Sequence, residues 1–395
     1  MARIAFFTEK LPPDETDPIV GFSYDLICSL ADQQHEVRVL STYREEDPLP
    51  PPRPRVDILR PFRKWNWLEV PRVIPALLEF RPEILHVIQP RAESLQGFTN
   101  AMTAVPGLVP LLGKPALITS FYDLREESLK SYRPLLLASD AVTVMSLPQR
   151  DLLARFYETN RARRNPALTV LPAPVVTHRS DDETTGEIVV YDGPPESMRD
   201  LVTDKKLVFV PGDIGDHRAP ESVFELLARL LSRYPEAVVV FGGGWGKLPA
   251  LRRHSLMRTF EKRGLGARVL VSGPLSASVE RWCLDSARVV FTASLPTESL
   301  RLTRLLRDAL HSAAPIVMAS EQAKSDPLPW QDRMHSFIAG SDAPSWEQAL
   351  ADALESDEAV EGIRSRLPEF SRSEAVDQPG NVMSRVYSSI LERRR

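Results

Sequence analysis

The chain has 395 residues, of which 43% are hydrophobic and 26% charged, and its formal net charge is −4. This length is too great for one ordinary core and fits two domains of common size. The composition is that of a water-soluble globular chain, and the weak net charge excludes a general basic field of the kind that gathers nucleic acid. We therefore expect a two-domain globular protein with no nucleic-acid partner.

The apolar run at the amino terminus, IAFF at 4–7, is far shorter than a signal peptide and is followed by charged residues. No uninterrupted apolar stretch reaches the roughly 18 to 20 residues that cross a bilayer. Two cysteines, Cys28 and Cys283, lie far apart in apolar, helix-like stretches, so we predict buried free thiols rather than a disulfide. These features predict a cytoplasmic protein, either soluble or attached to the inner face of the membrane.

The amino-terminal half alternates strand-like with helix-like runs, the pattern that builds βαβ units around a parallel sheet. We expect a strand over 3–8, a helix over 22–34, and strands over 36–41, 84–88, 116–120, 141–144 and 168–171. A proline-rich stretch, 47–55, breaks the pattern and is predicted to be a loop. We interpret 1–178 as a Rossmann-like first domain.

A polar, acidic and turn-rich stretch then follows, and we interpret 179–206 as a linker, with or without a small hairpin at 188–191. Beyond it we expect strands over 207–210, 237–241, 268–271, 289–292 and 316–319, and helices over 221–233, 248–263, 278–286 and 301–312. This predicts a second Rossmann-like domain over 207–378 and a C-terminal helix over 379–395, whose return to the first domain stays open. Ligands of doubly wound sheets sit at the carboxyl ends of the strands, so we expect two α/β domains facing each other across a cleft.

Short segments of both halves follow one another in the order found in a known enzyme family. They are IAFFT at 4–8, the loop that reaches Gly21, RPEILHV at 81–87, ASDAVTV at 138–144, FVPG at 209–212, VVVFGGG at 238–244, GLGARV at 264–269 and PIVMAS at 315–320. Over essentially the whole chain this order resembles the family 4 retaining glycosyltransferases of the GT-B fold. The resemblance implies an enzyme without metal or cofactor that moves a sugar from a nucleoside diphosphate sugar to a cell-envelope glycan or lipid acceptor. It also implies that the domain over 1–178 lies on the acceptor side and that the domain over 207–378 binds the nucleotide sugar.

Two acids match the residues with which the family surrounds the sugar and the ribose. The family has two glutamates eight positions apart, whereas Glu298 and Asp308 are 308 − 298 = 10 positions apart and the second acid is shortened. The resemblance implies that Glu298 lies at the reacting sugar and that Asp308 accepts hydrogen bonds from the ribose hydroxyls, a role that suits a carboxylate. The alternative is that both are solvated residues at helix ends.

Three further residues match the nucleotide-binding positions. Gly21 lies at the end of the loop between the first strand and helix, where a glycine either lets backbone N–H groups approach a phosphate or merely closes the turn. Arg218 matches the family's phosphate-binding lysine, and a guanidinium suits a diphosphate, but Asp213 stands where the family has an arginine. Gly273 lies where the family reads the base through main-chain atoms.

Departures from the family pattern keep a second function open. Tyr122 stands where the family carries a histidine near the transferred sugar; as a catalytic residue it can replace one hydrogen bond but not an imidazole's charge. Tyr122, Asp213, Asp308 and the loss of glycines after Glu298 are four departures from the family pattern in one site. They favour the alternative of a catalytically impaired GT-B protein that binds a ligand or partner. A nucleotide-sugar epimerase is less favoured because its acid/base residues have no counterparts, and no residues have metal-ligand spacing.

A basic and aromatic stretch lies at 60–68 in the first domain. It contains Arg60, Arg63, Lys64, Trp65 and Trp67. Tryptophan rings favour the headgroup region, and each cation near an anionic surface contributes about 1 kcal/mol, so this stretch is a candidate membrane or acceptor contact. The alternative is that the tryptophans cover the edge of the core while the cations stay in water.

Overall fold

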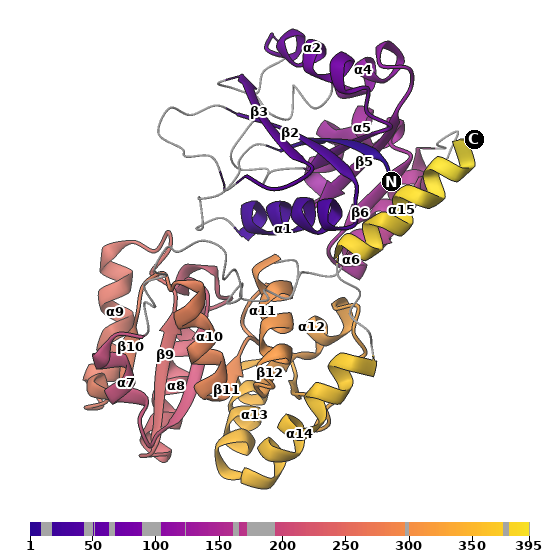
Figure 1. Cartoon of the computed structure of the whole chain (residues 1–395). Coiled ribbons are helices and arrows are strands. Elements are labelled where there is room, and N and C mark those ends of the chain that lie inside the picture. The colour runs from indigo at the N-terminus through magenta and orange to yellow at the C-terminus, as the bar shows by residue number, and fades with distance from the viewer. Residues whose placement is uncertain are drawn as a thin grey trace. The chain divides into compact units, whose positions relative to one another are not determined.

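A computed structural model of the chain describes residues 1–8, 18–42, 50, 52–62, 68–88, 104–122, 124–160, 166–171, 194–296, 300–373 and 379–394 (Figure 1). The chain forms two compact units. The first combines Met1–Pro174 with Asp377–Arg395, and the second is Val175–Val376. Each unit is a sheet with helices packed on it, and each is described below by itself.

The first unit is built on a sheet of seven described strands, all paired in parallel. They are β1 (Arg3–Phe7), β2 (Glu36–Thr42), β3 (Val56–Phe62), β4 (Ile84–Ile88), β5 (Ala116–Phe121), β6 (Ala141–Val144) and β7 (Ala167–Val170). Their order is β3-β2-β1-β4-β5-β6-β7, the Rossmann order with one added strand. Every residue of β4, β5 and β6 is buried, as expected for strands covered on both faces.

Helices cover this sheet. They are α1 (Pro18–Asp32), α2 (Val70–Phe80), α4 (Val105–Leu111), the 3₁₀ turn η1 (Glu126–Ser128), α5 (Leu129–Ala138), α6 (Leu147–Thr159) and α15 (Pro379–Arg394). The last of these, α15, packs against α1, although more than 340 residues separate them in the chain (Figure 1). The two helices approach so closely that a Cβ added to Gly380 would overlap the side chain of Ser29.

A buried polar chain joins α15 to the middle of the first sheet. His86 on β4 contacts the Tyr387 hydroxyl through Nδ1 at 2.5 Å and the Ser120 hydroxyl through Nε2 at 2.6 Å, and Ser120 contacts Thr143 at 2.6 Å. Burial lowers the pKa of His86 to about 3, so the imidazole is neutral at physiological pH. His86 is therefore a packing and anchoring residue, as its place in an apolar strand suggests.

The second unit repeats the same strand order. Its described strands are β8 (Lys206–Pro211), β9 (Ala237–Gly242), β10 (Val269–Val271), β11 (Ala287–Phe291), β12 (Ile316–Ala319) and β13 (Phe337–Ala339). Its helices are α7 (Glu196–Val202), η2 (Ile214–Asp216), α8 (Pro220–Arg233), α9 (Ala250–Glu261), η3 (Gly266–Arg268), α10 (Ala277–Ser286), α11 (Leu300–His311), α12 (Ser320–Ser325), α13 (Ala343–Glu355) and α14 (Asp357–Ser373). The order β10-β9-β8-β11-β12-β13 reverses direction between β8 and β11, which makes this pair the topological switch point.

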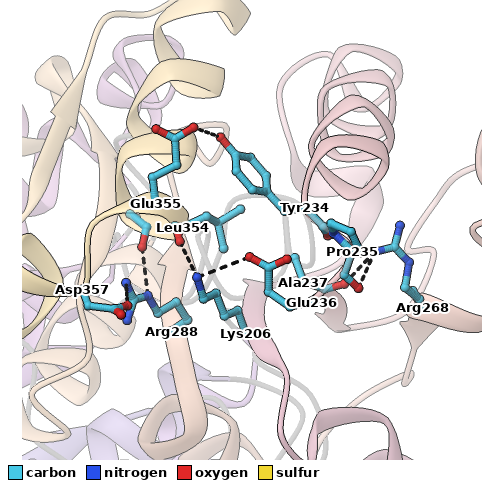
Figure 2. Close-up of polar contacts among 11 residues, drawn as sticks. Lys206, Tyr234, Pro235, Glu236, Ala237, Arg268, Arg288, Leu354, Glu355 and Asp357 are labelled. Carbon is cyan, nitrogen blue, oxygen red and sulfur yellow. Dashed lines mark hydrogen bonds and ion pairs between the residues drawn. The ribbon is translucent and has the colours of Figure 1, made fainter.

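Basic side chains hold two helix ends at the amino edge of the second sheet (Figure 2). Arg268 donates from Nη1 to the carbonyls of Tyr234 and Pro235, both at 2.9 Å, just past the end of α8. Lys206 donates to the Leu354 carbonyl at 2.7 Å, at the end of α13, and Arg288 pairs with Asp357 at 2.6 Å. Cations stabilise the carboxyl ends of helices, where backbone carbonyls lack partners.

Most predicted elements are present with ends shifted by a few residues, and the exceptions have physical reasons. The predicted linker is wrong in part, because 196–202 form α7 and its Met198 and Val202 are buried in the core of the second unit; the hairpin proposed at 188–191 lies outside the described residues. Strand β3 was not predicted. It contains Pro61, which is tolerated because β3 is an edge strand. Both cysteines are free and buried, which confirms that prediction.

Candidate functional site

The loop after β8 lies at the switch point of the second unit, where a doubly wound sheet binds its ligands. Gly212 has φ +92° and ends the strand, and the turn η2 follows at Ile214–Asp216. The loop leads into α8, with Ala219 in the left-handed region at φ +48°. The sequence thus places its candidate phosphate ligand, Arg218, between the buried end of one strand and the start of a helix.

Asp213 holds this loop against the loop after β9. Its Oδ1 accepts a hydrogen bond from the Gly244 N–H at 2.7 Å, and the Ile214 N–H donates to the Gly244 carbonyl at 2.9 Å. The two loops approach so closely that a Cβ on Gly243 would overlap the backbone of Gly212. Asp213 stands where the resembled family has an arginine, and in this structure it links the two loops.

Arg218 presents a partly exposed guanidinium beside the switch point. Its backbone N–H donates to the Ser294 carbonyl at 2.7 Å, which ties the loop after β8 to the loop after β11. Its Nη1 lies 3.2 Å from Oε2 of Glu321, with 48% of the arginine and 52% of the glutamate side chain exposed. Such an exposed pair is weak, so an anionic ligand can compete for this arginine.

Two residues of this site, Glu321 and Ser294, were missed by sequence reasoning. Both follow the carboxyl end of a strand, β12 and β11 respectively. That position is the signal that could have found them, because polar residues there face the ligand edge of a parallel sheet.

Gly273 follows β10 at the same edge of the sheet. Its φ is +76°, a conformation that favours glycine. The preceding Ser272 fixes the turn, because its hydroxyl donates to the Phe241 carbonyl at 2.8 Å. The backbone at Gly273 thus lies at the carboxyl edge of the sheet, and the predicted main-chain contact to a base stays a prediction.

Of the two acids predicted around the sugar, the structure describes only Asp308. Glu298 lies outside the described residues. Asp308 lies on α11, roughly 12 Å along the helix axis from Leu300, at 1.5 Å per residue. Its Oδ2 is 3.5 Å from Nε of Arg304, and 14% of the Asp308 side chain is exposed. Asp308 already has a cationic neighbour, and its role at the ribose stays a prediction.

Tyr122 lies in the core of the first unit. It is 1% exposed, its ring packs edge-on against Phe22 at 4.8 Å, and Ser23 donates to its hydroxyl at 3.5 Å. Burial raises its pKa well above the usual value, which keeps the phenol protonated. These contacts give Tyr122 a packing role. Because its hydroxyl is buried, nothing in this structure supports the predicted catalytic role.

Gly21 does not close a turn, and the prediction of a glycine in the loop before the first helix is wrong on this point. Helix α1 begins at Pro18, so Gly21 lies inside its first turns. Proline suits the first helical position because its fixed φ is already helical. A Cβ on Gly21 would meet nothing within 4 Å, and the local backbone therefore does not require glycine.

The candidate membrane stretch is described in part. Arg60 belongs to β3 at the edge of the first sheet, and Leu68, the last residue of the stretch, is 63% exposed. Arg63, Lys64, Trp65 and Trp67 lie outside the described residues. Among the described helices, none has the length and apolarity needed to cross a membrane. Within the same residues, His, Cys, Asp and Glu side chains form no group of three or more that could hold a metal ion.

Comparison with known proteins gives a result at the level of structure. No model of a known protein family matches the chain. No curated protein sequence matches it significantly. A glycosyltransferase from Rickettsia africae superposes with a TM-score of 0.69 at 11% identity, covering 99% of this chain and 98% of its own. The HepE protein of Anabaena, solved with UDP, gives 0.67 at 13% identity over 98% and 100% of the two chains.

The chain has the GT-B fold. The prediction of two Rossmann-like α/β domains is thereby confirmed, and it agrees with the resemblance seen in the sequence. The N-terminal domain of a trehalose-6-phosphate phosphatase from Candida albicans also superposes, with a TM-score of 0.68 at 12% identity over 99% of this chain and 97% of that one. A GT-B fold at such identities does not determine the reaction, because one fold serves several chemistries.

Proposed function

We propose that this protein is a retaining glycosyltransferase that moves a sugar from a nucleoside diphosphate sugar to a cell-envelope glycan or lipid acceptor. The observation that carries the proposal is the partly exposed Arg218 at the switch point of a GT-B unit. The solved HepE structures, one with UDP and one with UDP and glucose, support it by fold likeness. In this proposal the diphosphate lies against Arg218, the base at Gly273, and the ribose and sugar near Asp308 and Glu298.

The proposed chemistry needs no nucleophile from the protein. The bond between the anomeric carbon and the diphosphate oxygen breaks, the acceptor oxygen bonds to that carbon on the same face, and the acceptor proton passes to the departing diphosphate. The protein then contributes positioning and stabilisation of the charge that develops on the leaving oxygen. Arg218 supplies that stabilisation, because a guanidinium stays charged at any physiological pH and binds phosphate oxygens in a fork.

Arg218→Ala is expected to weaken binding of a nucleoside diphosphate by about 1.5 to 3 kcal/mol, the range for a charge-assisted hydrogen bond, and to leave binding of the bare nucleoside unchanged. A thermal-shift screen of nucleoside diphosphates first identifies the base, since binding to the native state raises the melting temperature. Calorimetry with the diphosphate and its nucleoside then measures both affinities.

Two variants sharpen this test. Glu321→Gln removes the competing carboxylate and is expected to strengthen diphosphate binding. Arg229→Ala changes an arginine that is 47% exposed and pairs with Glu347 elsewhere in the unit, so it should change neither affinity. Equal losses for diphosphate and nucleoside in Arg218→Ala would mean that this arginine does not contact the phosphates.

A second candidate function, a ligand- or partner-binding protein without catalysis, is favoured by one set of contacts. The residues that depart from the family pattern serve internal contacts here: Asp213 with Gly244, Asp308 with Arg304, and Tyr122 with the core. Release of nucleoside diphosphate from UDP-glucose or GDP-mannose in the presence of acceptor lipids separates the two functions. Tight binding without release at any protein concentration favours the second candidate.

Peripheral membrane contact through the basic, aromatic stretch is part of the proposal. We expect the protein to sediment with vesicles that contain anionic lipid and to be released by salt, because salt screens the charges. The double variant Arg63→Glu, Lys64→Glu is expected to bind these vesicles more weakly. Lys262→Glu, Arg263→Glu, the same charge change at the end of α9, is the control and should bind like the wild type. If the wild-type protein does not bind anionic vesicles at low salt, a soluble acceptor is the better proposal.

A further inference from the structure

Three loops meet at the switch point of the second unit and are joined by side chains that are themselves buried. The loops follow the neighbouring strands β8, β11 and β12. His217, Ser294 and Gln322 link them, and each is at least nine-tenths buried. We call these three residues the switch-point brace.

Gln322 joins the loop after β11 to the turn after β12. Its Nε2 donates to the carbonyls of Thr292 and Leu295, at 2.7 and 2.8 Å. Its Oε1 accepts from the Ala319 N–H at 2.9 Å, the reach of a third-position glutamine back to the start of its helix. The Thr292 hydroxyl also donates to Oε1, at 3.3 Å. The buried amide is thus fully used as donor and acceptor.

Ser294 lies between the two carbonyls that Gln322 holds, and it supports the loop after β8. Its hydroxyl is 2.7 Å from Nδ1 of His217, and its carbonyl accepts the Arg218 N–H at 2.7 Å. Two successive residues of the loop that carries the candidate phosphate ligand therefore rest on one residue of the neighbouring loop.

The ion pair of Arg218 with Glu321 connects the loop after β8 to α12, where Glu321 directly precedes Gln322. The backbone of Arg218 is fixed by buried contacts, whereas its guanidinium is held by an exposed glutamate alone among the contacts described here. This combination fixes where the side chain begins and leaves its charged end available to a ligand.

We propose that Gln322 is a positioning residue that, through Ser294 and His217, sets the place of Arg218 for a diphosphate; this rests on the function proposed above. Without the amide, the Leu295 carbonyl loses its side-chain donor, and the Thr292 carbonyl keeps only the Leu295 N–H at 2.8 Å. A buried carbonyl that has lost its partner is costly enough to move the loop. Arg218 then shifts with Ser294. A shift of about 1 Å in a positioning group can lower binding or rate by up to a hundredfold.

Gln322→Leu removes the amide at similar volume, and Gln322→Glu keeps the acceptor but loses both donors. Two measurements follow: amide hydrogen exchange of the peptide over 213–219, and affinities for UDP and uridine, or for the base that the thermal-shift screen selects. Arg268→Met is the matched control, because Arg268 also binds several backbone carbonyls but at the opposite edge of the same sheet (Figure 2).

We expect both Gln322 variants to exchange faster over 213–219 and to lose about tenfold or more in diphosphate affinity with nucleoside affinity kept, whereas Arg268→Met shows neither change. Unchanged exchange over 213–219, or equal losses for diphosphate and nucleoside, overturns the positioning role. If the wild type binds no nucleoside diphosphate, the proposed function fails while the exchange experiment still tests the brace. If a Gln322 variant does not fold, Ser294→Ala, which removes the hydroxyl contact to His217, is measured in its place.

Discussion

Asp326→Ala is expected to lower the free energy of unfolding of the second unit by about 3 to 5 kcal/mol, the usual loss when one partner of a buried ion pair is removed. Asp326 lies 3.0 Å from Nη2 of Arg307, with 2% and 0% of the two side chains exposed. Among the described residues, Nε and Nη1 of Arg307 have no hydrogen-bond partner. The remaining guanidinium would therefore be buried without a counter-charge.

Urea unfolding measures this loss, and two variants act as controls. Arg307→Met is expected to be milder, because Asp326 keeps hydrogen bonds from the Leu328 N–H at 2.8 Å and from Nε1 of Trp330 at 3.2 Å. Asp285→Ala breaks an exposed pair with Arg281 and should lose less than about 1 kcal/mol. An Asp326→Ala variant no less stable than Asp285→Ala would contradict the importance of this pair.

Acid is expected to destabilise the first unit through His86. Burial lowers its folded-state pKa to about 3, below the unfolded value of 6.5. The unfolded chain therefore binds a proton that the folded chain does not, and the stabilising contribution, present above pH 6.5, is lost as the pH falls toward 3. At about 1.36 kcal/mol per pH unit, the loss at pH 5 is about 2 kcal/mol. Burial also lowers the pKa of His35, which acts in the same direction.

The urea midpoint at pH 7.5 and at pH 5 tests this linkage. His86→Gln is expected to be less stable at pH 7.5, because its contacts with Tyr387 and Ser120 change, but to lose less stability on acidification. His254→Asn alters an exposed histidine on α9 and should keep the wild-type dependence. If His86→Gln and the wild type have the same pH dependence, the proton taken up on unfolding belongs to another group.

Continuous apolar runs made the central strands predictable, whereas edge elements lacked that signal. Strands β4, β6 and β12 have the predicted ends because both faces of each are buried. The missed strand β3 mixes Asp57, Arg60 and Pro61 with apolar residues, as an edge strand tolerates. Helix α7 was read as linker because it is short and follows a polar stretch, and its burial depends on contacts distant in sequence.

For the site, the sequence could place residues at strand ends but not pair them. The resemblance pointed to Arg218, and the structure places it in the loop after β8, at the switch point. Its neighbours Ser294 and Glu321 are 76 and 103 residues away, distances at which no periodicity operates. The hydrogen bond that converts Asp213 into a structural residue reaches Gly244, 31 positions on. The start of α1 at Pro18 has a local signal, because proline suits the first helical position.

The return of α15 to the first unit has a consequence for how the chain acquires its structure during translation. Residues 377–395 complete that unit, and Tyr387 reaches its buried histidine. The second unit is one continuous segment, 175–376. On the ribosome the second unit can therefore finish first, although it is made later, while the first waits for α15 to emerge. Until then the face of α1 that α15 covers, which includes Ser29, stays uncovered, and such incomplete units favour association between nascent chains.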